Sequence, residues 1–188
     1  MRIIGGTHRG THLAELGKGD AAAHLRPTSD RVREAMFNLL INGRLDGGPN
    51  PVAGARVLDL FAGTGALALE AMSRGAAAAT LVEDGKVALA LIKRNLEITR
   101  MRAVVLRQSA VALPRNTAGP FDLIFMDPPY ARQMGEAALA SARAGGWIAP
   151  GAVVVWEENA AITAPPDFAP LDQRTYGDTT ITILRTPV

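Results

Sequence analysis

The stretch RVLDLFAGTGAL at residues 56–67 predicts a short apolar strand, a glycine-rich turn and the start of a helix that continues to about Arg74. The same pattern recurs through the rest of the 188-residue chain. Further apolar strands are expected at 80–82, 104–106, 121–126 and 153–156, with helices at 86–99 and 135–143. Near-continuous apolar strands separated by helices are typical of a parallel sheet that is covered on both faces. We therefore expect a doubly wound α/β domain of the Rossmann-like kind.

The two ends of the chain depart from this alternation. After a turn at Gly177-Asp178, alternating Thr and Ile side chains predict an antiparallel strand within 175–185. Residues 2–16 read as two short strands around a glycine-rich turn, and a helix is expected from about Thr28, behind an extended Arg-Pro pair. The core-facing helix positions are expected to be Val32, Met36, Leu39 and Leu40, followed by Val87, Leu91 and Ile98 in the helix at 86–99.

These patterns predict a mostly parallel, seven-stranded sheet with an antiparallel C-terminal strand. Two parts are expected along the chain: an N-terminal extension of a small β-hairpin and a helix at 1–50, and the main α/β domain at 51–188. The composition is that of an ordinary globular protein, with a net charge of only +2 and no cysteine. The lack of cysteine excludes disulfides, thiolate metal sites and a cysteine nucleophile, and we expect no metal. No apolar run reaches the ~18 residues of a membrane span, so a cytoplasmic protein is expected.

The glycine turn is compatible with two kinds of nucleotide cofactor. Gly63-x-Gly65-x-x-Ala68 satisfies the dinucleotide fingerprint, and Glu83 stands twenty residues after Gly63, where an acidic side chain would bind a ribose. Asp59 favours a different cofactor, because a carboxylate inside a buried strand is costly unless a cation meets it. The ammonium group of S-adenosylmethionine is such a cation, whereas a pyrophosphate would be repelled. We therefore predict S-adenosylmethionine, with a dinucleotide as the alternative.

A second motif, Asp127-Pro128-Pro129-Tyr130, directly follows the apolar strand at 121–126. An exocyclic base amine is a poor nucleophile because its lone pair is delocalised into the ring, and two acceptors would localise and aim that lone pair. The Asp127 carboxylate and the Pro128 carbonyl can be these acceptors, since two prolines fix φ and supply no competing N–H. Tyr130 offers a flat face on which an extruded base can stack. The motif predicts methyl transfer to an exocyclic amine of a nucleic-acid base.

Three stretches resemble the RsmD family, bacterial enzymes that make N2-methylguanine in 16S ribosomal RNA of the small subunit. They are Arg-Pro-Thr at 26–28 leading into DRVREAMFN at 30–38, DLFAGTGAL at 59–67, and the Asp-Pro-Pro-Tyr motif. The resemblance implies a class I methyltransferase fold, and ribosomal RNA, free or within an assembling small subunit, as the partner. It implies catalysis at Asp127, Pro128 and Tyr130, and a cofactor site formed by Asp59, Phe61, Gly63, Gly65, Glu83, Ser109 and Asp127. Gln108-Ser109 stands where many relatives carry an acidic or amide residue, and Ser109 is expected to meet the adenine.

RNA selectivity is expected to lie in residues 1–34, because cofactor binding and catalysis occupy the α/β domain. The candidate phosphate contacts are Arg9, Lys18, Arg26, Arg31 and Arg33. The alternative is that this segment only covers the sheet. Three other functions stay open: an adenine-N6 methyltransferase, a protein-glutamine methyltransferase and a non-catalytic RNA-binding module. The first two more often carry Asn in place of Asp127.

Overall fold

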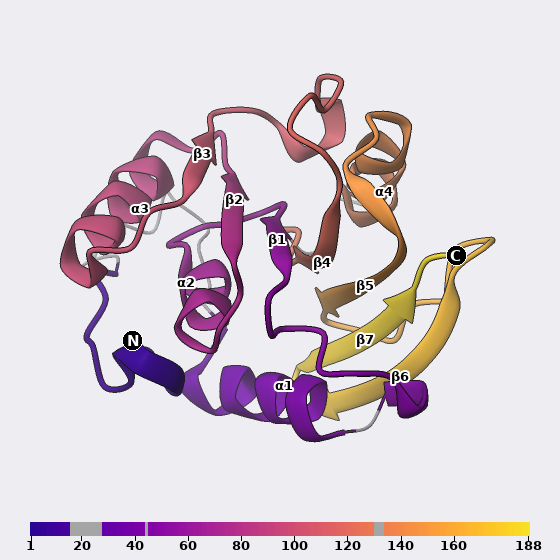
Figure 1. Cartoon of the computed structure of the whole chain (residues 1–188), viewed down its shortest axis with the longest axis horizontal. Coiled ribbons are helices and arrows are strands. Elements are labelled where there is room, and N and C mark those ends of the chain that lie inside the picture. The colour runs from indigo at the N-terminus through magenta and orange to yellow at the C-terminus, as the bar shows by residue number, and fades with distance from the viewer. Residues whose placement is uncertain (16–27, 44, 130–133) are drawn as a thin grey trace.

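The structure, a computed structural model, describes residues 1–15, 28–43, 45–129 and 134–188. Its centre is a seven-stranded sheet with the strand order β3-β2-β1-β4-β5-β7-β6 (Figure 1). The first five strands in this order are parallel, and β7 is antiparallel to both β5 and β6. The strands are β1 (Arg56–Asp59), β2 (Ala78–Val82), β3 (Val104–Leu106), β4 (Phe121–Met126), β5 (Ile148–Glu158), β6 (Ala169–Tyr176) and β7 (Thr179–Arg185). This confirms the predicted doubly wound, mostly parallel sheet.

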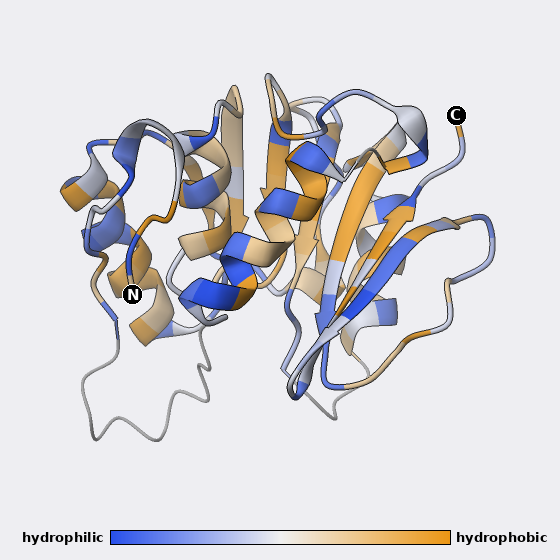
Figure 2. Cartoon of the chain, turned by 90° about the horizontal axis from the view of Figure 1, so that it is seen from below, coloured by the Kyte–Doolittle hydropathy of each residue, from blue (hydrophilic) through white to orange (hydrophobic). Residues whose placement is uncertain are grey.

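Helices cover both faces of the sheet. Apolar side chains of three helices, α1 (Asp30–Asn42), α2 (Ala66–Ser73) and α3 (Lys86–Thr99), join the core on one face. On the other face the core is completed by α4 (Met134–Ala144) and the short 3-10 helix η4 (Ala110–Ala112). Figure 2 shows the apolar strands in the middle of the molecule and polar residues on the outer sides of the helices. Two further 3-10 turns are η1 (Gly6–His8) and η3 (Leu45–Gly47).

The order of the strands reverses between β1 and β4. From β1 the chain moves outward through β2 to β3, and from β4 it moves outward in the opposite direction through β5. In open α/β sheets, ligands bind outside the carboxyl ends of the strands at such a reversal. Asp59 is the last residue of β1, and Asp127 directly follows β4. The fold therefore places the two aspartates that the sequence analysis singled out on adjacent strands at the expected edge.

Several predicted elements match the structure, and others need correction. The helix at 86–99 has the predicted bounds, but Val87 is 42% exposed and is not a core residue. The buried positions of α3 are instead Ala88, Ile92, Asn95 and Thr99, because the helix turns an adjacent face toward the sheet. The helix expected from Thr28 begins at Asp30, where the Ser29 hydroxyl accepts a hydrogen bond from the Val32 N–H at 3.3 Å. In the described part of residues 2–16, a single isolated bridge, Arg2 with His12, replaces the predicted hairpin.

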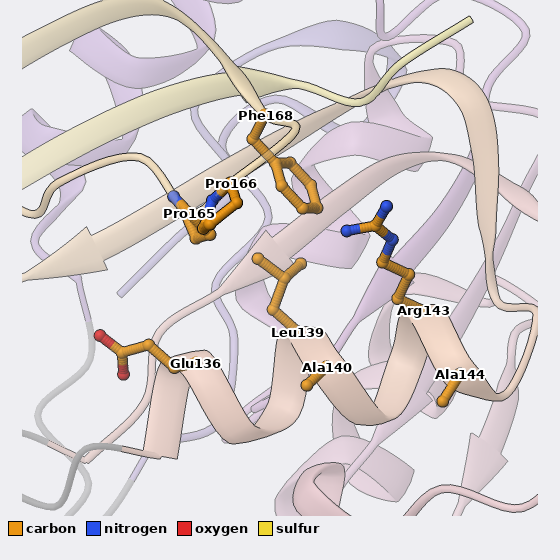
Figure 3. Close-up of a pocket in the computed structure, with 8 residues that line it drawn as sticks. All are labelled: Glu136, Leu139, Ala140, Arg143, Ala144, Pro165, Pro166 and Phe168. Carbon is orange, nitrogen blue, oxygen red and sulfur yellow. The ribbon is translucent and has the colours of Figure 1, made fainter.

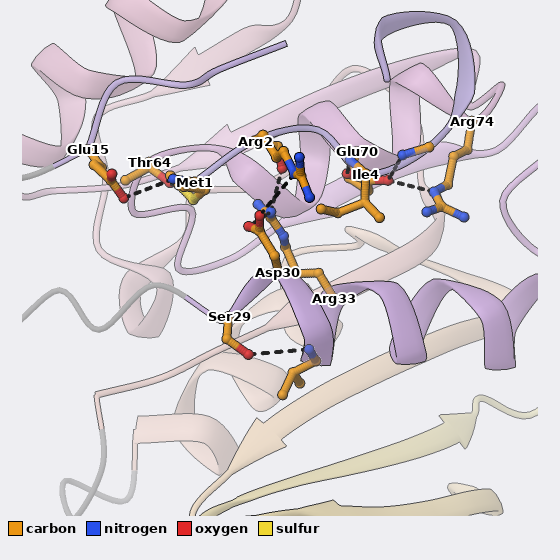
Figure 4. A network of polar contacts seen from close by, with 12 residues as sticks. Met1, Arg2, Ile4, Glu15, Ser29, Asp30, Arg33, Thr64, Glu70 and Arg74 are labelled. Atoms are coloured by element: carbon orange, nitrogen blue, oxygen red, sulfur yellow. Dashed lines mark hydrogen bonds and ion pairs between the residues drawn. The ribbon is translucent and has the colours of Figure 1, made fainter. Parts of the chain in front are cut away.

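The N-terminal segment is attached to α2 through a buried carboxylate. Glu70 is fully buried and accepts hydrogen bonds from the backbone N–H groups of Ile4 (2.7 Å) and Gly5 (2.8 Å) (Figure 4). Arg74, one helical turn further along α2, donates its Nε to Glu70 at 2.6 Å. Gly6 has a φ of +75°, and a Cβ on it would lie 1.8 Å from the Ser73 carbonyl oxygen. This close approach requires glycine and holds the start of the chain against the domain.

Candidate functional site

Three carboxylates gather at the carboxyl ends of β1, β4 and β5, on one face of the sheet. Asp59 pairs in register with Phe125, and Met126 pairs with Trp156, so Asp127 and Glu157 occupy the next paired position. Side chains two residues apart on a strand share a face. The residues two positions before these three carboxylates are Val57, Phe125 and Val155, and all of them belong to the core cluster on the α1 and α2 side. The three carboxylates are therefore neighbours on adjacent strands.

The glycine turn after β1 is held by backbone hydrogen bonds at the same edge. The Ala62 N–H donates to the Val82 carbonyl at 3.1 Å, and the Gly65 N–H donates to the Ala62 carbonyl at 2.6 Å. Gly63 and Gly65 have φ values of +55° and +80°, which favour glycine. A Cβ on Gly65 would also lie 2.9 Å from a methyl group of Leu81. The turn therefore keeps bare backbone beside the end of β1, as the sequence analysis expected.

Glu83, at the end of β2, ties this turn to the neighbouring strand. Its Oε2 accepts from the Gly63 N–H at 2.8 Å, and its Oε1 accepts from the N–H groups of Asp84 (3.0 Å) and Gly85 (2.8 Å). The structure thus brings Glu83 into contact with the glycine turn. Its expected contact with a ribose stays a prediction.

Asp59 is a buried carboxylate with too few partners. It is 1% exposed, and its Oδ2 accepts one hydrogen bond from the Ala68 N–H at 3.3 Å. Its Oδ1 is buried and has no hydrogen-bond partner among the described residues. Burial, together with the charge of Glu83, raises the pKa of Asp59 to about 7. An orphaned carboxylate oxygen beside a glycine turn fits a ligand that carries a positive charge, such as the ammonium of S-adenosylmethionine.

Asp127 stands opposite Asp59 across the strand reversal. Its side chain is half-buried, and the following Pro128 is buried. Burial raises the pKa of Asp127 well above its usual range, and the charges of Glu157, Asp59 and Glu158 raise it further. In its ionised form a carboxylate with a raised pKa is a stronger base than an ordinary one, which suits a group that takes a proton from an amine. Tyr130 lies outside the described residues, so its predicted role stays a prediction.

Glu157 is a residue of this edge that the sequence analysis missed. It is 3% exposed, and its Oε2 accepts a hydrogen bond from the Thr28 hydroxyl at 2.8 Å. Thr28 lies just before α1, so this contact joins the segment that leads into α1 to the end of β5. A signal was available in the sequence, because Glu157 directly follows the apolar stretch 153–156, just as Asp127 directly follows 121–126.

Two further expected cofactor residues lie near the ends of their strands. Phe61 comes two residues after β1 and packs against the apolar cluster on the α4 side. Ser109 precedes η4, and its carbonyl accepts from the Ala112 N–H at 3.1 Å. The contact of either residue with a cofactor stays a prediction. The described residues contain no group of three or more His, Cys, Asp or Glu side chains that could hold a metal ion.

The expected basic residues of the N-terminal segment fall into three groups. Arg9 and Arg31 are exposed, whereas Lys18 and Arg26 lie outside the described residues. Arg33 is fully buried, and its Nη2 donates to the Asp30 carboxylate at 2.6 Å and to the Arg2 carbonyl at 2.5 Å (Figure 4). A buried guanidinium cannot reach an RNA phosphate, so the prediction for Arg33 is wrong. The helix turns this position inward, where the cation supports the attachment of the N-terminal segment.

A separate hollow lies between α4 and the segment that precedes β6 (Figure 3). Its volume is about 440 Å³, and its lining is dominated by Leu139, Pro165, Pro166 and Phe168. None of the carboxylates of the strand edge lines it.

Among the described residues, no helix is long and apolar enough to cross a membrane.

The chain is similar to a family of known proteins over nearly its whole length. The family model described as conserved hypothetical protein 95 matches residues 1–185. Ribosomal RNA small subunit methyltransferase D of Escherichia coli K12 is 38% identical over 173 residues, which cover 90% of this chain and 81% of that protein. The protein of the same name from Haemophilus influenzae is 32% identical over 185 residues, covering 94% and 89%. The solved structure of yhhF from Escherichia coli superposes with a TM-score of 0.82 at 32% identity, covering 100% of this chain and 98% of that one.

Proposed function

This chain belongs to the RsmD family (conserved hypothetical protein 95), and we propose that it methylates the exocyclic N2 amine of a guanine in 16S ribosomal RNA, with S-adenosylmethionine as the methyl donor. Its relatives carry the name ribosomal RNA small subunit methyltransferase. The observation that carries the proposal is the strand edge, where the under-partnered carboxylate of Asp59 and the carboxylate of Asp127, whose pKa is raised, stand on adjacent strands. The first suits a cationic cofactor, and the second suits an amine.

The cofactor would be held by the residues around the glycine turn. Asp59 supplies the counter-charge for its ammonium group, and the backbone at Gly63 and Gly65 allows it to approach closely. Glu83 is the proposed ribose contact, and Phe61, Ser109 and Asp127 complete the proposed site. When bound, S-adenosylmethionine supplies an electrophilic methyl group on a sulfonium. Protonation of Asp59 removes the negative charge that would bind the cofactor cation. Because the pKa of Asp59 is about 7, cofactor affinity is expected to fall below pH 7.

Asp127 and Pro128 prepare the amine. The Asp127 carboxylate accepts one N–H of the exocyclic amine and the Pro128 carbonyl accepts the other, which localises the nitrogen lone pair and directs it. The amine loses one proton after it has gained the methyl group. The raised pKa of Asp127 makes its carboxylate a suitable acceptor for that proton, which then passes to solvent. Tyr130 is proposed to stack on the base.

We also propose a division of labour along the chain. Residues 1–50 would bind the RNA, with Arg9, Lys18, Arg26 and Arg31 as phosphate contacts, and residues 51–188 would carry out methyl transfer. The partner is ribosomal RNA, free or within an assembling small subunit, and the compartment is the cytoplasm. Arg9 and Arg31 are exposed, which supports their assignment. The alternative role of the segment as a structural cover is compatible with its attachment to Glu70.

The decisive experiment is the transfer of a tritiated methyl group from S-adenosylmethionine to total RNA, followed by digestion to nucleosides. Label in N2-methylguanosine is the expected result, and Asp127→Ala should abolish it while S-adenosylhomocysteine still binds. Label in N6-methyladenosine would replace the guanine assignment with the adenine one. Calorimetric titration with S-adenosylhomocysteine and with NAD tests the cofactor independently, and binding of NAD alone would refute the proposal.

A further inference from the structure

We propose that Glu157 determines base specificity: its carboxylate accepts the ring N1–H of the target purine while Asp127 accepts the neighbouring exocyclic N2 amine. This inference rests on the proposed function, because it assigns the base that the same site selects. Guanine carries both donors on one edge. Adenine carries an acceptor at N1, which a carboxylate would repel.

The first support is the position of Glu157 beside Asp127. Met126 and Trp156 are paired in register on adjacent parallel strands, and Asp127 and Glu157 are the residues that follow them. Neighbouring strands lie about 4.8 Å apart, and paired residues point to the same face. Two carboxylates at this separation present acceptors to two adjacent donors of one planar base edge. Two neighbouring carboxylates can therefore accept from both donors on the guanine edge, whereas a single carboxylate would leave one donor to another partner.

The second support is how Glu157 is held. The Thr28 hydroxyl donates to its Oε2 at 2.8 Å, and the side chain is 3% exposed. A carboxylate has two oxygens with two lone pairs each, so a hydrogen bond to one oxygen restricts the orientation of the group without using all of its acceptor positions. A fixed acceptor discriminates between bases more sharply than a mobile one, because it cannot move away from a mismatched atom.

The third support is charge. Asp127 and Glu157 follow a paired position on adjacent strands, and the charge of Glu157, after burial, raises the pKa of Asp127. Like charges at this distance are unfavourable in the free protein. A base edge with two donors would relieve the repulsion, whereas an edge with a donor and an acceptor would relieve only part of it. The arrangement therefore favours guanine, and the unpaired acceptor left by a mismatched base should cost roughly 10- to 100-fold in kcat/KM.

The test uses base analogues at one position of the RNA. Once the methylated nucleotide is mapped, RNAs are assembled with guanine, 2,6-diaminopurine or inosine at that position alone. The analogue 2,6-diaminopurine keeps the C2 amine but has an acceptor at N1, and inosine, which lacks the amine, is the blank. Wild-type protein should methylate the guanine RNA at least about 10-fold faster, as kcat/KM, than the diaminopurine RNA. Equal rates would overturn the proposal without any variant.

The variant Glu157→Gln sharpens the test, because its amide N–H₂ can donate to the N1 acceptor of diaminopurine. It should lower kcat/KM for guanine by roughly 10- to 100-fold and shift the guanine-to-diaminopurine ratio toward the analogue by at least about tenfold. The matched control is Glu97→Gln, which makes the same change at an exposed position on α3 and should leave the ratio unchanged. Thr28→Val removes the hydrogen bond to Glu157. If Glu157 served only to hold the segment before α1, Thr28→Val would cause the same loss of kcat/KM as Glu157→Gln.

Four outcomes separate the possibilities. An equal loss on both RNAs with Glu157→Gln would show a structural role and overturn the proposal. If the variant fails to fold, as judged by circular dichroism and binding of S-adenosylhomocysteine, the wild-type analogue ratio decides alone. Absence of N2-methylguanosine with the wild type would overturn the proposed function and this inference together. Normal guanine methylation without discrimination would overturn the inference only.

Discussion

Replacing Asp59 with Asn should stabilise the free protein at pH 8 and weaken its binding of cofactor. The carboxylate is 1% exposed and has one hydrogen bond, from the Ala68 N–H at 3.3 Å. An isolated buried charge is costly, and an amide of the same shape avoids that cost. The same substitution removes the counter-charge proposed for the cofactor ammonium. We therefore expect stability and affinity to move in opposite directions.

The magnitude follows from the pKa of Asp59, which is raised from 3.8 to about 7. At 1.36 kcal/mol per pKa unit, ionised Asp59 costs the folded protein about 4 kcal/mol at pH 8. At pH 5 the carboxyl is largely protonated in the folded protein, and the cost is about 1.5 kcal/mol. Because the folded pKa lies above the unfolded value, this contribution to stability is complete below pH 3.8 and is lost as the pH rises to about 7. The substitution should therefore be about 2–3 kcal/mol more stabilising at pH 8 than at pH 5, whatever fixed cost the buried amide adds.

Urea denaturation of wild type and variant at the two pH values measures this difference directly. The matched control is Asp84→Asn, which removes an exposed carboxylate near the same edge of the sheet. It should change the free energy of unfolding by the same amount at pH 5 and at pH 8. Calorimetry with S-adenosylhomocysteine at pH 8 should show at least about a tenfold loss of affinity for Asp59→Asn. If the free energy of unfolding changed equally at pH 5 and pH 8, Asp59 would not be the desolvated carboxylate described above.

Three other predictions concern chemistry, RNA binding and the N-terminal attachment. Asp127→Ala should reduce single-turnover methyl transfer by at least about 10²-fold and weaken the binding of S-adenosylhomocysteine far less, and near-normal transfer would remove Asp127 from its assigned role. Arg9→Ala should lower the slope of log affinity against log salt by roughly 0.7–0.9 in filter-binding assays, whereas an unchanged slope would place the RNA elsewhere. Gly6→Ala should destabilise the fold by several kcal/mol more than Gly10→Ala, because both glycines have a positive φ but only Gly6 meets backbone within 4 Å. Thermal denaturation compares these two variants, and equal losses would contradict the importance of the close approach.

The parallel part of the sheet could be predicted because its signals are local. Apolar runs such as 121–126 mark strands buried on both faces, and the helix α3 shows helical spacing over its full length. The site followed from the same local reading, since Asp59 and Asp127 each stand at the end of an apolar strand. Ligands bind where the strand order reverses, and this rule assigns both residues to one predicted site.

Elements that depend on distant contacts could not be predicted in the same way. The strand β6 reads APLDQRTY, is largely exposed at the edge of the sheet, and is defined by its pairing with β7 rather than by alternation of its own side chains. Arg33 was expected to face RNA because basic residues are usually exposed, but it is buried against Asp30 and the Arg2 carbonyl. The direction of a helical side chain depends on which face the helix buries, and nothing near Arg33 in the sequence specifies that.

Two buried carboxylates, Glu70 and Asp59, differ in the hydrogen-bond partners that the protein gives them. Glu70 receives hydrogen bonds from the N–H groups of Ile4 and Gly5, 66 and 65 residues away in sequence, and from the Arg74 side chain. Its charge is therefore compensated within the protein, and it stabilises the attachment of the N-terminal segment. Asp59 has one hydrogen bond, and its buried Oδ1 has no hydrogen-bond partner among the described residues. A buried charge that the protein leaves uncompensated is unfavourable until something else supplies the partner. Each is an isolated acidic residue in an apolar stretch of sequence, so only the distant donors distinguish the carboxylate that is compensated within the protein from the one that we propose binds the cofactor ammonium.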